Sequence, residues 1–409
     1  MAQPVFIIGG SQTDFARNWA REGSGLHELM DTSINGALDQ SGMAGSDIEV
    51  AHIGNFVGEL FAGQGNLGGF LATINADLMG IPASRHEGAC ASGSLAILAA
   101  TADIEACRYG TALVTGVELM RNVPGRQAAD FLGAAAWQGR ETDGRKYVWP
   151  SIFSDLLEFY QDRYGIEREH LAAISRKNFD NAKANPLAQT RHWEFPAEAF
   201  GEDDDANPVI EGSIRRSDCG QVTDGAATVI LAGEKVAAAW AARHGKSLAD
   251  LPRISCWGHT SAPMMLADKL KAAPKEGYLF PMIRKAITDA FKRADIPGHQ
   301  ALDGIELHDC FSITEYMLTE HFGLAAPGEA WKAIEAGDTL KTGKLPVNAS
   351  GGLIGGGHPV GATGIRMLLD ASKQVTGQAG DCQIDGARRM ATMNIGGSGV
   401  TNVSFIVER

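Results

Sequence analysis

The sequence predicts an α/β protein made of two similar halves, and three observations support this prediction. Strand-like and helix-like runs alternate over residues 1–120, which is typical of helices layered on a largely parallel sheet. A strand-like run returns after Cys219, and the alternation restarts beyond Ala242. In each half, small residues around one reactive side chain, Cys90 or His358, precede a helix and then a strand, which indicates an internal duplication.

Hydrophobic periodicity places the individual elements along the chain. Helices are expected where apolar residues recur at helical spacing, and strands where short apolar runs end at glycine or polar residues. The expected strands are 5–9, 50–57, 112–116, a run after Asp224, 305–307, 390–395 and 400–407; the expected helices are 26–40, 90–108, an alanine-rich helix ending at Ala242, one whose apolar face runs from Met282 to Phe291, 313–322 and 367–375.

Residues 121–218 break this alternation and are expected to form an inserted loop domain. Prolines, tryptophans and short helical patches occur there without a β-α-β order. Over 121–192 there are 11 Lys/Arg against 9 Asp/Glu, in a chain whose net charge is −13. Such a stretch suits a phosphate-bearing ligand, although an ordinary solvated surface has the same balance. We therefore expect an N-terminal half at 1–120, the insertion at 121–218, the remainder of the N-terminal half at 219–262, and a C-terminal half at 263–409.

Composition excludes several classes of function. The net charge of −13 argues against nucleic-acid binding, which needs a basic surface. No apolar run approaches the ~20 residues that a membrane-spanning helix needs. The six cysteines form no Cys-x-x-Cys pair, which argues against a structural zinc site and for a reduced compartment. We expect a cytoplasmic protein that acts on small molecules, with no nucleic-acid, membrane or metal partner.

Cys90 lies in the stretch Glu87-Gly-Ala-Cys-Ala-Ser-Gly-Ser94, just before an apolar run that is expected to be helical. A thiol at a helix N-terminus meets unpaired N–H groups and the positive end of the helix dipole, both of which favour the thiolate. The small neighbours leave room for a bulky acyl group. A lone cysteine is more often a buried structural residue, so the prediction of a nucleophile depends on motifs further along the chain.

His358 lies in a loop that is unusually rich in glycine. Seven glycines occur between Gly351 and Gly364, and they permit positive φ angles and close approach of the backbone to a substrate. An imidazole in such a loop suits a general base, because it titrates near neutral pH. A lone histidine in a glycine-rich loop is more often only a surface residue.

Two further stretches carry polar or flexible residues next to expected strands. His308-Asp309-Cys310-Phe311 follows the strand 305–307, and α/β folds place their chemistry at the C-terminal ends of strands. A core cysteine beside a hydrogen-bonded histidine accounts equally well for this motif alone. Asn394-Ile-Gly396-Gly-Ser-Gly399 lies between the last two strands, and by itself it is no more than a hairpin bulge.

One glycine pattern suggests a different function. Gly63-Gln-Gly-Asn-Leu-Gly68 matches the dinucleotide-binding pattern G-x-G-x-x-G. It does not follow its strand directly, and no acidic residue is convincingly placed about 20 positions later. Loop or helix-entry glycines are the better interpretation.

Taken together, these motifs resemble those of the thiolase superfamily over essentially the whole chain. Cys90-Ala-Ser-Gly resembles the sequence around the thiolase nucleophile, and Gly357-His358-Pro359 resembles the Gly-His-Pro motif of the family. Asp224-Gly-Ala-Ala also lies where such sequences carry it. The resemblance implies two duplicated halves in a five-layer α-β-α-β-α arrangement, with the insertion binding coenzyme A.

The chain departs from ordinary thiolases at two places. Their Asn-Glu-Ala-Phe is here His308-Asp-Cys310-Phe, and their late Cys-x-Gly is here Asn394-Ile-Gly396. Both departures resemble the sterol-carrier-protein type of thiolase. In that type, the resemblance implies that the cysteine of His-Asp-Cys-Phe takes over the catalytic role of the missing late cysteine. The stretch with Asn394 and Gly396 is then expected to form the oxyanion loop.

The resemblance implies acyl transfer by a ping-pong mechanism, as thiolysis of a 3-oxoacyl-CoA or the reverse Claisen condensation. His358 deprotonates Cys90, which takes the acyl group while the N–H groups of Cys90 and Gly396 stabilise the oxyanion. The second thioester carbonyl lies near His358 and His308, and Cys310 exchanges the α-proton. Coenzyme A and acyl-CoA are implied as substrates, with no permanently bound cofactor, and the protein is expected to be a homodimer or homotetramer.

Two other interpretations stay open. A ketosynthase-like condensing enzyme, with an acyl-carrier-protein donor, shares the use of Cys and His, although His308-Asp-Cys-Phe argues against it. A catalytically degenerate thiolase would serve as a scaffold in a complex with another acyl-CoA protein. The presence of Cys90, Cys310 and both histidines argues against a degenerate site.

Overall fold

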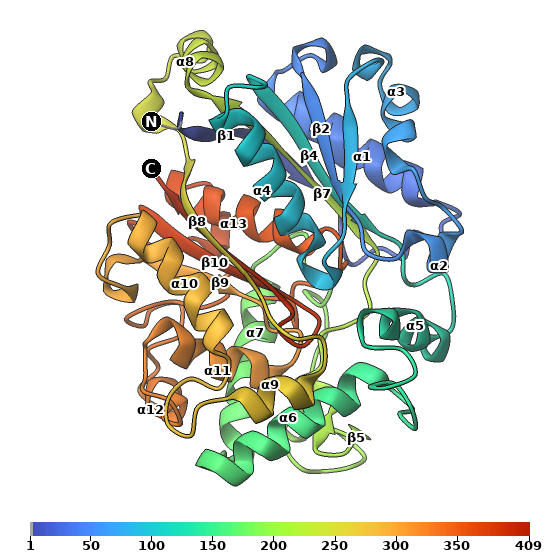
Figure 1. The fold of residues 1–409 in the computed structure, drawn as a ribbon, viewed down its shortest axis with the longest axis vertical. Helices are drawn as coiled ribbons and strands as arrows, with labels where there is room; N and C mark the ends of the chain where they lie inside the picture. Colours follow the sequence, from blue (N-terminus) through green and yellow to red (C-terminus); the bar gives the residue numbers. More distant parts are fainter. Residues whose placement is uncertain (1–2) are drawn as a thin grey trace.

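The computed structural model describes residues 3–409 and shows a mixed β-sheet flanked by helices (Figure 1). In these residues the strand order is β3-β2-β4-β7-β1-β8-β11-β10-β9. A separate two-stranded sheet pairs β5 with β6. The strands are β1 Val5–Gln12, β2 Val50–Gly54, β3 Ala83–His86, β4 Thr111–Glu118, β5 Val209–Glu211, β6 Ile214–Arg215, β7 Gly225–Gly233, β8 Arg253–Ser261, β9 Gly304–Leu307, β10 Arg389–Gly396 and β11 Thr401–Glu408.

The two ends of the large sheet repeat one topology. The first half runs β3-β2-β4-β7-β1, in which β7 is antiparallel to both neighbours and β2 is parallel to both of its own. The second half runs β9-β10-β11-β8 with the same relative directions. Val347 forms a parallel bridge beside Ile305, at the place that β3 takes in the first half. The duplication seen in the sequence pattern is therefore a duplication of strand order.

Strand directions agree with the prediction for the first 120 residues. Because β7 is antiparallel to both β4 and β1, strands β1, β2, β3 and β4 all run in the same direction.

The halves join where Val5 and Phe6 of β1 pair with Ile254 and Arg253 of β8. Strands β3 and β8 were not predicted from the sequence. The expected domain boundaries stay predictions, although β8 pairs with β11 of the second half.

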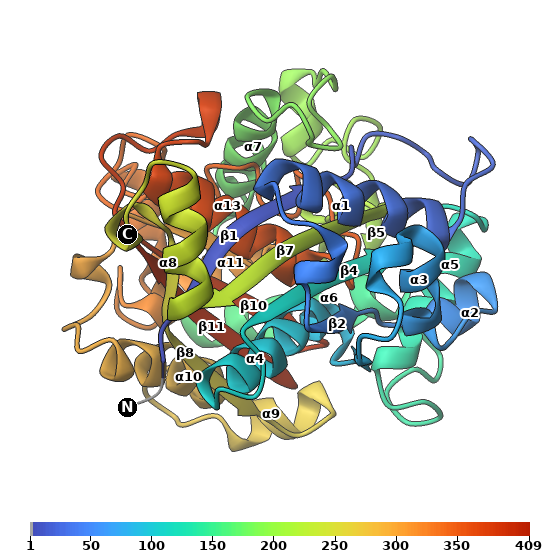
Figure 2. The same ribbon diagram turned by 90° about the horizontal axis from the view of Figure 1, so that it is seen from above.

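Helices and strands stack in five layers, which confirms the arrangement implied by the family resemblance. Helices α4 (Ser92–Glu105) and α13 (Thr363–Thr376) lie between the two halves and share one apolar core with strands of both. Helix α1 (Leu26–Ser41) covers the outer face of the first half together with α8 (Glu234–Arg243). Figure 2 shows α1 and α4 on opposite faces of β7 and β4. Helices α10 (Pro281–Arg293) and α11 (Ser312–Phe322) cover the outer face of the second half.

The insertion contains two long helices, so the expectation of short helical patches was wrong. Helices α6 (Val148–Tyr164) and α7 (Arg168–Lys183) follow the short α5 (Gly125–Leu132). Apolar residues of α6, among them Leu156 and Tyr160, join the core under α11. The remaining helices are α2 Gly58–Ala62, α3 Leu71–Ile74, α9 Leu266–Ala272 and α12 Ala330–Glu335.

Gly63 to Gly68 do not form a nucleotide-binding turn between a strand and a helix. Gly63 ends α2 in the left-handed conformation, and Gly68 lies in a 3₁₀ turn at Leu67–Phe70. Loop glycines are therefore the right interpretation. Within residues 3–409, no helix combines the length and the apolar character that crossing a membrane requires.

Four glycines meet where the loop that carries His358 crosses the start of helix α4. A Cβ added to Gly93, in the first turn of α4, would lie 2.7 Å from the carbonyl oxygen of Gly361. Gly54 on β2 and Gly116 on β4 approach the same oxygen, at 2.9 and 2.3 Å from their added Cβ positions. Only glycine fits at these positions, because the atom that a side chain would meet belongs to the backbone.

We predict that Gly93→Ala destabilises the protein by about 1–3 kcal/mol, since the new methyl group forces the Gly361 loop away from α4. Denaturant unfolding measures this change. Gly69→Ala is the control, because nothing lies within 4 Å of its added Cβ. Equal midpoints for the two variants would contradict the close packing of the loop on α4.

Candidate functional site

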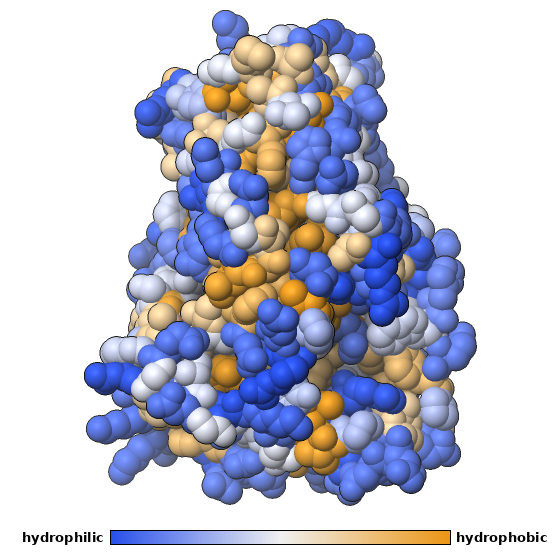
Figure 3. Space-filling view, turned by 90° about the vertical axis from the view of Figure 1, so that its right-hand side faces the viewer, coloured by the Kyte–Doolittle hydropathy of each residue, from blue (hydrophilic) through white to orange (hydrophobic). Residues whose placement is uncertain are grey.

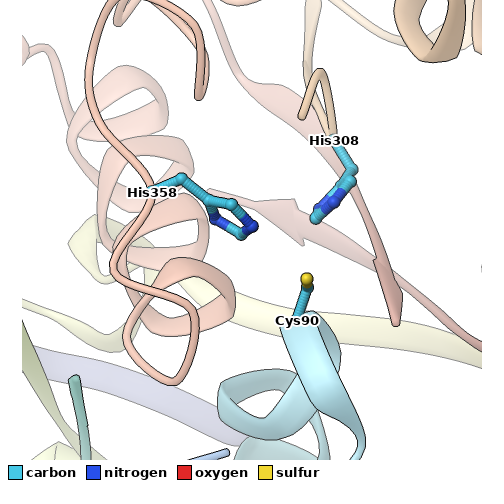
Figure 4. A group of neighbouring side chains, drawn as sticks. All are labelled: Cys90, His308 and His358. Carbon is cyan, nitrogen blue, oxygen red and sulfur yellow. The ribbon is translucent and has the colours of Figure 1, made fainter. Parts of the chain in front are cut away.

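Three reactive side chains from distant parts of the sequence converge between the two halves (Figure 4). Cys90 lies just before α4, His308 just after β9, and His358 on the glycine-rich loop before α13. The sulfur of Cys90 and one nitrogen of each histidine lie within 4.8 Å of one another. The two imidazole rings stand edge to face, with centroids 5.2 Å apart. Sulfur and imidazole nitrogen at this spacing also suit a shared metal ion such as Zn²⁺.

A strained turn presents Cys90 to this space. Cys90 lies in the 3₁₀ turn Ala89–Ala91, directly after Ala89, whose φ is +51°. The carboxylate of Glu87 accepts a hydrogen bond from the Ala89 N–H, and the Ser92 hydroxyl accepts one from Gly88 N–H. A non-glycine residue in the left-handed region costs roughly 1–2 kcal/mol, and such strain is typical of functional turns.

The environment of Cys90 does not favour a free thiolate, contrary to the prediction from its helix position. Burial raises the pKa of Cys90 to about 12, even though the N–H of Gly397 points at the sulfur and acts in the opposite direction. The helix terminus does not compensate for the loss of water around the sulfur. Cys90 is therefore a thiol at rest and needs a base to become a nucleophile.

The surroundings of His358 keep its ring neutral and fix its orientation. Its Nδ1 lies 2.7 Å from the Thr363 hydroxyl, which donates its own proton to the Pro359 carbonyl. Thr363 therefore accepts from the Nδ1–H of His358, so that Nε2 carries the free lone pair. Burial, reinforced by the positive charge of Arg366, lowers the pKa of His358 to about 3. The backbone N–H of His358 is fixed by the Thr223 hydroxyl at 2.8 Å.

His308 is almost completely buried, and its contacts involve the predicted oxyanion-loop residue Asn394. The side-chain amide nitrogen of Asn394 lies 3.0 Å from Nδ1 of His308. Burial, followed by the effect of the neighbouring His358, lowers the pKa of His308 well below its ordinary value. Within residues 3–409 neither His308 Nε2 nor His358 Nε2 has a hydrogen-bond partner. Both atoms are therefore free to contact a substrate.

Asp309, between the two predicted catalytic residues, shapes the His358 loop. Its carboxylate accepts hydrogen bonds from Leu353 N–H and Ile354 N–H at 2.6 and 3.1 Å. The added Cβ of Gly352 would lie 2.4 Å from this carboxylate, and the φ of Gly352 is +60°. The glycines of the loop are thus needed both for conformation and for space.

Cys310 and an apolar cavity lie beside this group. The cavity has a volume of about 300 Å³, and both Cys90 and Cys310 line it with His358. Burial raises the pKa of Cys310 well above its ordinary value, and Cys90 contributes to this shift. Gly397 lines the cavity, whereas the predicted Gly396 does not. Most of the other lining residues are apolar, including Phe56, Met120, Leu132, Phe153 and Val360.

Three residues that organise the site were not predicted from the sequence. Glu118 accepts hydrogen bonds from the N–H groups of Phe56 and Gly361, and burial raises its pKa to about 7. It therefore ties the His358 loop to the end of β2. Thr363 contacts His358 directly, and the Ser94 hydroxyl donates to the Asn394 side chain that contacts His308. Neither residue differs from an ordinary helix residue in the sequence. Only Glu118 left a signal, as an acidic residue at the end of an apolar strand.

Comparison with known families agrees with this geometry. A family model described as "Thiolase, N-terminal domain" matches residues 5–211, and one described as "Thiolase C-terminal domain-like" matches residues 267–409. The chain belongs to the thiolase superfamily. The thiolase fold therefore accounts for the meeting of Cys90, His308 and His358 from both halves.

Thiolase relatives of two kinds are similar to this chain over nearly its whole length. The acetyl-CoA acetyltransferase of Methanothermobacter thermautotrophicus is 32% identical over 99% of both chains. Sterol carrier protein 2 of Gallus gallus is 28% identical over 99% of this chain and 72% of its own length. The solved structure of an Ltp2-ChsH2(DUF35) aldolase has a TM-score of 0.78 and 18% identity, with 99% of this chain and 97% of that chain covered, which shows a shared fold.

We predict that His358 stays uncharged at pH 5, because burial lowers its pKa far below the ordinary value of 6.5. As the pH falls from 7.5 to 5, its ring signals in NMR spectra of ¹⁵N-histidine-labelled protein should not titrate. The His358→Asn variant assigns the signals. A titration midpoint near 6.5 would show that water reaches the imidazole.

Proposed function

We propose that this thiolase is an acyltransferase that moves acyl groups between coenzyme A thioesters through an acyl-Cys90 intermediate. The observation that carries the proposal is the convergence of Cys90 Sγ with the histidine nitrogens of His358 and His308 beside one apolar cavity. The base and the nucleophile come from opposite halves of the duplicated fold. The similarity to two acetyl-CoA acetyltransferases supports the same class of reaction.

In the thiolytic direction, both sulfurs start as thiols, which is the form that burial favours. His358 Nε2 takes the proton of Cys90, and the sulfur attacks the 3-oxo carbon of a 3-oxoacyl-CoA. The bond between the α- and β-carbons then breaks. Cys310 gives its proton to the departing enolate, which leaves as an acyl-CoA with a two-carbon acyl group. The proton on His358 then passes to Cys310, which becomes a thiol again.

Coenzyme A then completes the cycle. His358 takes the thiol proton of coenzyme A, whose sulfur attacks the acyl-Cys90 carbonyl, and Cys90 leaves and regains a proton from His358. The N–H groups of Cys90 and Gly397 point at the sulfur, and we assign them as the backbone donors for the oxyanion. Loss of one such donor typically lowers the rate by roughly 10²–10³-fold. Every step runs in reverse for Claisen condensation.

The insertion supplies the wall of the cavity on which coenzyme A would lie. Tyr147, Trp149 and Phe153 line the cavity from the start of α6, and Arg216 lines it from the turn after β6. The guanidinium of Arg216 suits a phosphate of the nucleotide, and the aromatic side chains suit the pantetheine arm.

Two alternatives differ in the acyl donor or in the absence of turnover. A ketosynthase-like enzyme would accept acyl groups from an acyl-carrier protein, so rates with the two donors separate it from a thiolase. A catalytically degenerate scaffold would turn over no thioester at all. The intact arrangement of Cys90, His308 and His358 favours the enzyme.

Self-association belongs to the proposal as well. Strand β3 is an end strand of the sheet, and Ala83 and Ser84 are exposed along it. Figure 3 views the side on which α2, α3 and α5 lie in Figure 1, and an apolar band runs down this face. An uncovered strand edge favours pairing with a second copy, and apolar surface favours association. Light scattering on the purified protein distinguishes a dimer or tetramer from a monomer. A hetero-complex with another acyl-CoA protein is the competing form, and co-purification tests it.

We predict that incubation with a labelled acyl-CoA places the label on Cys90 and that Cys310→Ala retains this acylation. The Cys310→Ala variant should lose thiolysis and condensation by at least about 10²-fold, because the α-carbon then lacks its acid and base. Peptide mapping and steady-state rates measure the two effects.

The matched control is Cys219→Ala, since Cys219 lines the same cavity but has no assigned role. It should keep most of the activity. Label found only on another residue would exclude Cys90 as the nucleophile, and a fully active Cys310→Ala variant would exclude its role in proton exchange.

We predict that Arg216→Ala raises KM for an acyl-CoA several-fold, as expected for an exposed charge contact of up to about 1 kcal/mol. Its kcat should change little. A short N-acetylcysteamine thioester lacks the nucleotide phosphates, and its kinetics should not respond. Arg108→Ala, at an exposed site outside the cavity, is the control; equal KM changes for both thioesters would contradict a phosphate contact.

A further inference from the structure

The two positions at which the sequence departs from ordinary thiolases are in direct contact. His308 stands where those sequences have asparagine, and Asn394 stands where they have cysteine. The amide nitrogen of Asn394 lies 3.0 Å from Nδ1 of His308, and each residue is only 1% exposed. The two departures therefore form one structural unit.

Ser94 fixes which way the Asn394 amide faces. The Ser94 hydroxyl donates to Oδ1 of Asn394 at 2.8 Å, and an amide oxygen can only accept. The amide nitrogen is then directed at His308 and donates to Nδ1. Because Nδ1 accepts, the single proton of the neutral imidazole lies on Nε2.

His358 carries its proton on the opposite ring nitrogen. Its Nδ1–H donates to Thr363, so its Nε2 is a free acceptor. Both Nε2 atoms are buried without a partner in the described chain. One imidazole therefore offers a donor and the other an acceptor to the same space beside Cys90.

We propose that Asn394, anchored by Ser94, is a positioning residue that fixes the proton of His308 on Nε2. This inference rests on the proposed function. His308 then donates a hydrogen bond to the thioester oxygen and does not compete with His358 for the thiol proton. Ser94 lies in the first turn of α4, so the helix that follows the nucleophile also sets the tautomer of the second histidine.

A change of tautomer would remove the donor without removing the ring. With the proton on Nδ1, His308 would offer a second lone pair to a substrate oxygen, which is repulsive. Loss of one oxyanion donor costs roughly 10²–10³-fold in rate. In serine proteases, the wrong tautomer of the catalytic histidine lowers kcat by roughly 10⁴-fold.

The Asn394→Asp variant tests this directly, because a carboxylate has almost the same shape but only accepts hydrogen bonds. At pH 8 it should draw the His308 proton to Nδ1 while still accepting from Ser94. Two-bond ¹H–¹⁵N spectra of histidine-labelled protein report which ring nitrogen carries the proton. We expect Nε2–H in the unaltered protein and Nδ1–H in the variant, with His308→Asn assigning the signals.

Kinetics provide the second measurement. Asn394→Asp should lower kcat and kcat/KM together by about 10²–10³-fold, as expected when only the transition state loses an interaction. Ser94→Ala releases the amide, so it should give a mixture of both tautomers and a smaller loss. Asn207→Asp places the same change at a buried site in the insertion, where the amide contacts Gly201 and Ser217, and should leave the His308 signals unchanged.

A proton on Nδ1 of His308 in the unaltered protein would overturn the proposal, as would an Asn394→Asp variant with unchanged tautomer and rates. A folded Asn394→Asp variant with low activity whose His308 still carries its proton on Nε2 would also reject the proposal, because the loss would then come from general disruption of the site. The spectra do not depend on catalysis. If the unaltered protein shows Nε2–H but never acylates Cys90, the proposed function fails and the assignment of the tautomer stands.

Discussion

Gly361 places its carbonyl oxygen in the narrow space between β2, β4 and the first turn of α4. Gly54, Gly93 and Gly116 surround that oxygen, and a methyl group on any of them would meet backbone. This contact brings the loop that carries His358 to the turn that carries Cys90. The reactive atoms come together only because four residues without side chains allow two halves of the chain to approach at backbone distance.

Burial at this junction determines the charges of the site. Desolvation raises the pKa of both sulfurs and lowers that of both histidines. The positive charge of Arg366 also lowers the pKa of both histidines, and Arg366 itself forms ion pairs with Glu306 and Asp370. The resting site therefore holds neutral thiols and neutral imidazoles, and any charge appears only during reaction, where surrounding water is absent and fixed dipoles act strongly.

Much of the fold and part of the site could be predicted from the sequence. In helices α1 and α10 the apolar residues recur with one clear helical period, so both helices could be predicted. The small residues around Cys90 and His358 could be recognised because acyl transfer to a cysteine needs space around the reactive side chains. Strand β8 was missed because Arg253-Ile-Ser-Cys-Trp-Gly-His-Thr-Ser has no regular apolar alternation. The contacts of Asn394 with Ser94 and His308 could not be predicted, since 300 positions separate Asn394 from Ser94 and only the folded chain brings their side chains together. Gly397, and not the predicted Gly396, lines the cavity. The prediction was wrong by one residue because a sequence pattern does not resolve a shift of one position at the end of a strand.

Helix α7 connects the insertion to the loop that carries His358. Asn178 donates to the Asp309 carboxylate, Asn181 to the Asn348 carbonyl, and Asn185 to the Ser350 carbonyl. The same insertion therefore forms a wall of the cavity and supports the loop that carries His358, the proposed general base. An exchange of this segment between relatives, made to alter the range of acyl chains accepted, would also move His358 unless the three asparagines were transferred together with the Asp309 carboxylate and the two backbone carbonyls that they contact. Selectivity and catalytic power are thus not separable modules in this chain.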